Sequence, residues 1–186
     1  MLNLSTLLED SARRYPSREA VVLGDSRLTY AQINGAANQV ANLLVERGIK
    51  PGDKVALSCP NLPYFPIVYY GILKAGAVVV PLNVLLKGRE VAYHLADSEA
   101  VAYFCFQGTD ELPIGQEGYA GFESSDGCEH FFVITVDPNE WNSGSVNRWV
   151  SPAGWEANSR LQVSAFITRV EWLSSAPLAW PVVPEV

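Results

Sequence analysis

Three short runs rich in β-branched and aromatic residues constrain the fold of this chain more than any other feature. They are Lys54 to Cys59 (KVALSC), Ala77 to Pro81 (AVVVP) and Val101 to Phe106 (VAYFCF), and segments with helical spacing separate them. Strands and helices that alternate with short connections are typical of a parallel sheet with helical crossovers. We therefore predict an α/β fold with a mostly parallel sheet and flanking helices. We expect the strand Ala77 to Pro81 to be covered on both faces.

The clearest helix signal runs from Tyr30 to Arg47. Thr29 and Gln32 form a capping-box pattern at its start, and Gly48 provides a C-terminal stop. Apolar residues recur at the spacing of one helical face. This spacing predicts a buried stripe of Ile33, Ala37, Val40 and Leu44.

Weaker patterns predict three further helices, over residues 4–15, from Asn61 to about Ala75, and over residues 88–97. We expect Asn61 to cap the second of them. Because Pro66 lacks a backbone donor, that helix should have an irregular first turn or begin near Pro66. Val91 and Leu95 share one face of the third.

A β-hairpin is predicted around Gly24 and Asp25, because Gly accepts the positive φ of a tight turn and apolar runs flank the pair. Phe131 to Val136 adds one more apolar run, which we interpret as a further strand. Gln107 to Glu129 is rich in Gly, Ser and acidic residues, so a long loop is expected there.

The composition changes near residue 140. All five tryptophans lie beyond that point, while no lysine follows Lys87 and no tyrosine follows Tyr119. Residues 139–160 have neither the helical nor the strand period. We therefore divide the chain into an α/β subdomain, residues 1–136, and an atypical Trp/Pro-rich tail, residues 137–186, which we interpret as frameshifted or poorly ordered.

Charge and cysteine content limit the classes of function. The formal net charge is −7 and the lysines are scattered, which argues against nucleic acid as a partner. The N-terminus lacks the apolar core of a signal peptide, and prolines interrupt the longest uncharged run, so neither secretion nor a transmembrane span is predicted. The three cysteines cannot all pair, which favours reduced thiols in a cytoplasmic protein.

Few residues show a catalytic pattern. Ser58 and Cys59 end a predicted strand, where α/β enzymes often place reactive groups, but they lack the glycines of a nucleophile elbow. Only His94 and His130 could serve as their bases. The glycines of GQEGYAG, residues 115–121, have no Lys or Ser/Thr behind them, as a phosphate loop would.

Two further groups of polar residues lack the pattern of a metal site or of a catalytic acid pair. Cys128, Glu129 and His130 are followed by no second ligand pair at zinc-site spacing. Asp110 and Glu111 are interpreted as solvated charges in a loop. We therefore assign no catalytic, cofactor-binding or metal-binding residue to this chain.

Three longer segments carry a family resemblance: LTYAQINGAANQVANLLVERGIKPGDKVAL, NLPYFPIVYYGILKAGAVVVPLN and REVAYHLADSEA. Together they resemble the N-terminal part of the adenylate-forming (AMP-binding) superfamily, particularly the acyl-CoA synthetases, or fatty-acid–CoA ligases. The resemblance covers about residues 5–135. It implies the first subdomain of such an enzyme's N-terminal domain.

The resemblance also implies a reaction for the full-length family. Those enzymes use ATP and Mg²⁺ to convert a carboxylic acid to an acyl-adenylate, and then transfer the acyl group to coenzyme A. Leu28, Thr29 and Tyr30 match one family motif and Leu73 to Asn83 match another, and both motifs build the fold rather than contact ATP. The family's phosphate loop ending in Pro-Lys-Gly, its adenine and ribose segments, its hinge and its C-terminal lysine are absent from the sequence.

We therefore expect a truncated fatty-acid–CoA ligase that is inactive alone and binds no cofactor by itself. The alternative is a non-catalytic binding or dimerisation module, which would form a homodimer through exposed apolar surface. A third possibility is an independent hydrolase that uses Cys59 or Ser58. The residues present do not indicate the acyl substrate or its chain length.

Overall fold

Four parallel strands form the central sheet, in the order β4-β3-β5-β6. The structure, a computed structural model, describes residues 3–135. The elements are α1 (Ser5–Arg14), β1 (Glu19–Leu23), β2 (Ser26–Thr29), α2 (Tyr30–Glu46), β3 (Lys54–Ser58), α3 (Tyr64–Lys74), β4 (Val78–Pro81), α4 (Gly88–Asp97), β5 (Ala100–Phe106), α5 (Ile114–Glu123) and β6 (His130–Ile134).

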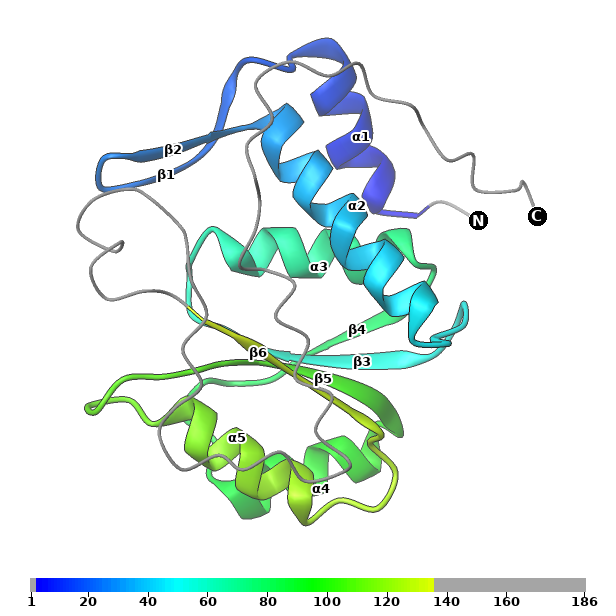
Figure 1. Cartoon of the computed structure of the whole chain (residues 1–186), viewed down its shortest axis with the longest axis vertical. Helices are drawn as coiled ribbons and strands as arrows, with labels where there is room; N and C mark the ends of the chain where they lie inside the picture. Colours follow the sequence, from blue (N-terminus) through cyan, green and yellow to red (C-terminus); the bar gives the residue numbers. More distant parts are fainter. Residues whose placement is uncertain (1–2, 136–186) are drawn as a thin grey trace.

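The helices lie in two layers. Figure 1 shows α1, α2 and α3 on one face of the sheet and α4 and α5 on the other, with the antiparallel β1–β2 hairpin standing beside α2. The predicted α/β class, the parallel sheet, the hairpin around Gly24 and the strand after residue 130 are confirmed. The tail predicted for residues 137–186 lies outside the described residues.

Helix α2 forms where its capping signal predicts. The Thr29 side chain accepts a hydrogen bond from the Gln32 backbone N–H at 3.3 Å, and Gln32 Oε1 accepts one from the Thr29 N–H at 2.8 Å. The predicted apolar stripe is buried, and Gly48 follows the helix with φ +80°. Local signals and burial agree here, which is why this element is predicted so well.

Helices α2 and α3 pack closely because Gly71 has no side chain. A Cβ at this position would lie 2.5 Å from the Val40 Cβ of α2.

Helix α1 is held by one buried leucine and one ion pair. Of its two leucines only Leu8 is buried, and the Lys74 ammonium forms an ion pair with Glu9 at 2.5 Å. Leu7 is 58% exposed, so the apolar face predicted for α1 is only partly covered.

The predicted cap of α3 is wrong. The helix begins at Tyr64 behind Pro63, without any side-chain cap, and Asn61 lies in the preceding loop. Pro66 is the third residue of the helix. A backbone N–H at that position has no intrahelical acceptor, so the proline costs the first turn no hydrogen bond.

Strand β4 is not covered on both faces, contrary to the prediction. It is an edge strand, and Val78 is 48% exposed. A β-branched run bounded by Gly and Pro does not distinguish a central strand from an edge strand, because both have the same propensity.

The long loop expected over Gln107 to Glu129 is also wrong, because ten of its residues form α5. Gly115, Gly118 and Gly121 lie at i, i+3 and i+6 on the buried face of this helix. A Cβ would lie 2.3 Å from the Gln107 carbonyl oxygen at Gly115, and 2.5 Å from the Val91 Cβ at Gly121. Close packing against the sheet and α4 therefore overrides the low helix propensity of glycine.

Candidate functional site

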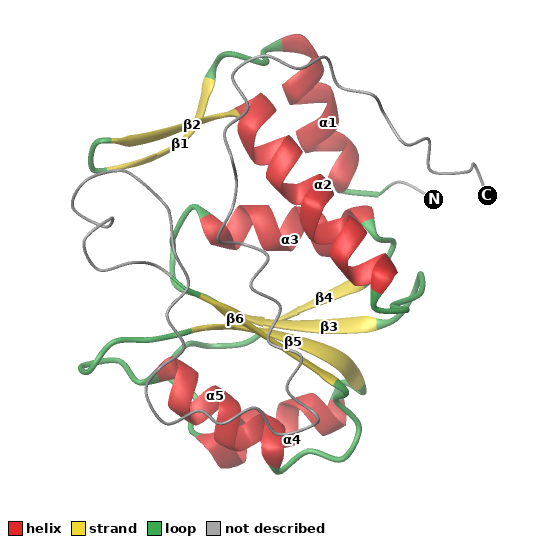
Figure 2. Ribbon diagram, viewed as in Figure 1, coloured by secondary structure: helices red, strands yellow, loops and turns green. Residues whose placement is uncertain are grey.

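The sheet order places a candidate binding edge at the carboxyl ends of β3 and β5. From β3 the chain passes through α3 to β4 on one side, and after α4 it returns to β5 on the other side of β3. The helices that follow β3 and β5 lie on opposite faces of the sheet (Figure 2). In open parallel sheets, ligands bind outside the carboxyl ends of the strands at such a reversal.

Two loops form this edge, residues 59–63 after β3 and residues 107–113 after β5. In the first loop, Cys59 and Leu62 are buried and Asn61 is exposed. The Leu62 N–H donates to the Pro60 carbonyl at 2.7 Å, which tightens the turn into α3.

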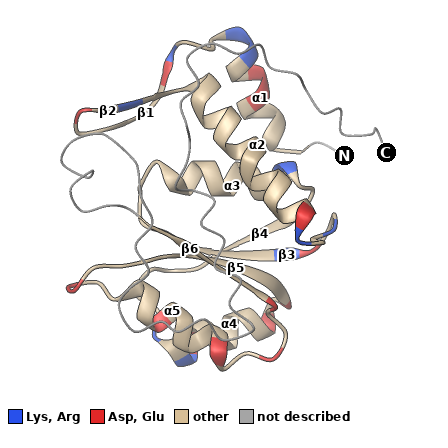
Figure 3. Cartoon of the chain, viewed as in Figure 1, with Lys and Arg blue, Asp and Glu red and all other residues tan. Residues whose placement is uncertain are grey.

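The second loop is a tight turn. The Thr109 N–H donates to the Leu112 carbonyl at 2.9 Å, and the Leu112 N–H donates to the Thr109 carbonyl at 3.1 Å. Gly108 has φ +84°, and a Cβ there would lie 2.6 Å from the Leu112 oxygen. Asp110 and Glu111 are exposed at its tip, which is red in Figure 3. Their predicted place in a solvated loop is confirmed.

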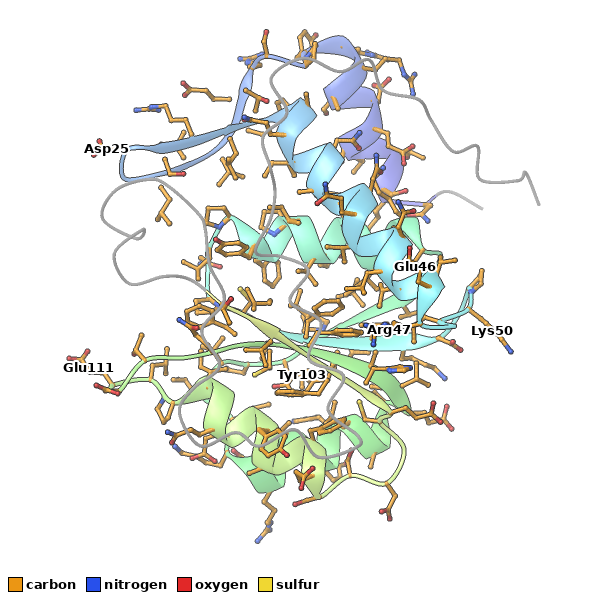
Figure 4. All side chains as sticks on the ribbon, viewed as in Figure 1. Asp25, Glu46, Arg47, Lys50, Tyr103 and Glu111 are labelled. Atoms are coloured by element: carbon orange, nitrogen blue, oxygen red, sulfur yellow. The ribbon has the colours of Figure 1, made fainter. Side chains whose placement is uncertain are left out.

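A buried polar pair lies behind the edge. The Tyr103 hydroxyl of β5 donates a 2.8 Å hydrogen bond to Ser58 Oγ of β3. Both residues are almost fully buried, and burial raises the pKa of Tyr103. Tyr103 lies between the sheet and α5 in Figure 4, where Gly118 leaves room for it. This pair was not predicted from the sequence: a Ser and a Tyr in apolar strands hint at buried hydrogen bonds, but only the strand order makes the two residues neighbours.

The candidate thiol nucleophiles are poorly suited to catalysis. Cys59, Cys105 and Cys128 are free and buried. Burial raises the pKa of each thiol to about 12, and the nearby Cys105 adds to the shift at Cys59. A thiol with such a pKa stays protonated near neutral pH and is a weak nucleophile.

The structure does not bring either histidine to Ser58. Ser58 pairs with Cys105, whereas His130 pairs with Ala102, three residues earlier on β5 and about 10 Å away along the strand. His130 stacks on Phe132, with the ring centroids 6.2 Å apart. The other histidine, His94, lies half-buried on α4 with its ring edge against Tyr93. These positions give no support to an independent hydrolase.

Two kinds of feature are absent from residues 3–135. Within that range, no group of three or more His, Cys, Asp or Glu side chains is placed to hold a metal ion. No helix in the same range has the length and apolar character to cross a membrane.

Comparison with known proteins decides the family. The family model described as AMP-binding enzyme matches residues 8–158. The chain belongs to the AMP-binding enzyme family.

Two ligases of Mycobacterium tuberculosis are similar to this chain in sequence. The long-chain-fatty-acid–CoA ligase FadD13 is 43% identical over 100 residues, covering 53% of this chain and 20% of FadD13. A medium/long-chain-fatty-acid–CoA/3-oxocholest-4-en-26-oate–CoA ligase is 40% identical over 101 residues, covering 54% of this chain and 18% of that ligase. The chain thus spans about a fifth of the length of these relatives.

A solved structure is similar to this chain in fold. An inhibitor-bound crystal structure of the N-terminal domain of FACL13 from Mycobacterium tuberculosis matches with a TM-score of 0.63 and 31% identity, covering 84% of this chain and 39% of that one. The fatty-acid–CoA ligase resemblance drawn from the three quoted segments is therefore confirmed.

Two of the quoted segments of this member of the AMP-binding enzyme family contact each other. Leu28, Thr29 and Tyr30 join β2 to the start of α2. The Gly52 N–H donates to the Gly76 carbonyl at 2.9 Å, so the turn before β3 is bonded to the turn before β4. Gly76 has φ +77°, and a Cβ there would press on Pro51 at 3.1 Å. Both glycines thus shape the amino edge of the sheet, opposite the candidate binding edge.

Proposed function

We propose that this chain supplies the first α/β subdomain of a fatty-acid–CoA ligase. The observation that carries the proposal is the sequence identity with FadD13, together with the likeness to the FACL13 N-terminal domain. Ligases of this class use ATP, Mg²⁺ and coenzyme A to activate a carboxylic acid. The cytoplasm remains the predicted compartment.

The loops after β3 and β5 would border the space in which the carboxylic acid is bound. In the loop after β3 the buried residues Cys59 and Leu62 are apolar, and the switch-point topology favours a ligand at this edge. Neither loop contains a Lys or Arg, and Asp110 and Glu111 add negative charge. These residues therefore do not fit the triphosphate of ATP, which needs cations and oriented N–H groups.

We further propose that this chain alone forms no acyl-adenylate. Residues 1–186 contain no Thr/Ser/Gly-rich run that ends in Pro-Lys-Gly. The chain therefore offers no phosphate loop to stabilise the negative charge that develops during adenylation. The division at residue 136 stays a proposal, in which residues 137–186 form a Trp/Pro-rich tail of different composition.

Two assays with FadD13 as the positive control test these proposals. The chain is incubated with ATP, Mg²⁺, coenzyme A and a long-chain fatty acid, and no acyl-adenylate or acyl-CoA is expected by mass spectrometry. In a chimera, residues 5–135 replace the matching segment of FadD13, and ligase activity is expected. A folded but inactive chimera would contradict the subdomain role, whereas product from the chain alone would contradict only its inactivity.

The alternative is a non-catalytic dimerisation module. Two exposed leucines at the start of α1, the N-cap residue Leu4 at 48% and Leu7 at 58%, favour a contact at that end of the helix. Multi-angle light scattering tests it: a defined dimer that Leu7→Glu dissociates supports the module, and a monomer across the accessible concentration range rejects it.

A further inference from the structure

We draw no further inference here: the strongest candidate, the apolar patch that Leu4 and Leu7 expose at the start of α1, is an unpartnered helix end, and nothing in the part of the chain that the structure describes shows what covers it.

Discussion

The Tyr103 hydroxyl and Ser58 Oγ form a 2.8 Å hydrogen bond between two neighbouring parallel strands, in a region that excludes water. Neither group has a catalytic base beside it in the described residues. The pair therefore stabilises the junction of β3, β5 and α5, and its energetic role can be measured directly.

Tyr103→Phe should destabilise the chain by about 1–3 kcal/mol, because it leaves a buried Ser58 hydroxyl without its donor. Ser58→Ala should cost a similar amount. The double variant should cost clearly less than the sum of the two, since the orphaned group is then gone. Urea unfolding followed by circular dichroism measures all three, and additive losses would mean that the bond contributes nothing.

Gly118→Ala should destabilise the chain by roughly 1–3 kcal/mol through overpacking. The new Cβ would lie 2.4 Å from Cys105 Sγ and 3.0 Å from the Tyr103 hydroxyl. Gly35→Ala in α2 is the matched control, because a Cβ there meets nothing within 4 Å. It should stabilise by about 0.5–1 kcal/mol through helix propensity alone. Equal effects of the two substitutions would refute the packing explanation of α5.

The Glu117 carboxylate of α5 holds the start of α4. It accepts the Gly88 N–H at 2.8 Å and the Lys87 ammonium at 3.2 Å, and these bonds lower the pKa of Glu117 below its usual 4.5. Stability from this group is therefore full above pH 4.5 and is lost as the pH falls through the lower folded pKa. Glu117→Gln should flatten the acid side of the stability–pH curve, while Glu111→Gln in the exposed loop should leave its shape unchanged.

His130 should make the fold weaker in mild acid. Burial lowers the pKa of His130 below 6.5; the charge of Arg47 also lowers it, while Glu129 and the Arg47 backbone oppose the shift. The unfolded chain then binds the proton more readily, so stability falls as the pH drops below 6.5. His130→Gln should remove this slope between pH 7 and pH 5, and His94→Gln, the variant at the other histidine, should retain it. An unchanged slope in His130→Gln would reject the assignment.

All three cysteines should resist alkylation in the native chain. With a thiol pKa of about 12 at each, labelling by iodoacetamide at pH 8 should be at least about a thousandfold slower than in urea, because the thiolate reacts. Peptide mapping by mass spectrometry measures each site separately. Fast native labelling of Cys59 alone would reopen its assignment as a nucleophile.

Prediction of the fold from the sequence succeeds best where local and tertiary preferences agree. Thr29, Gln32 and Gly48 mark both ends of α2, and the buried stripe follows the same period. It failed at α5, because the three glycines pack against residues distant in sequence, and composition alone indicates a loop. It also missed the Ser58–Tyr103 pair, since strand order must be known before the two side chains can be placed together.

The exposed position of β4 has a consequence for self-association. The Val78 N–H donates to the Asp53 carbonyl just before β3, and the Leu82 N–H donates to the Leu57 carbonyl of β3. Because the direction of the backbone N–H alternates along a strand, the nitrogens of Val79 and Pro81 point away from β3. Proline has no N–H to offer, and Val79 is left as the outward donor within this strand. A strand of a second chain could therefore accept only one hydrogen bond from β4. This shortage of donors disfavours edge-to-edge aggregation, although the valine run is uncharged.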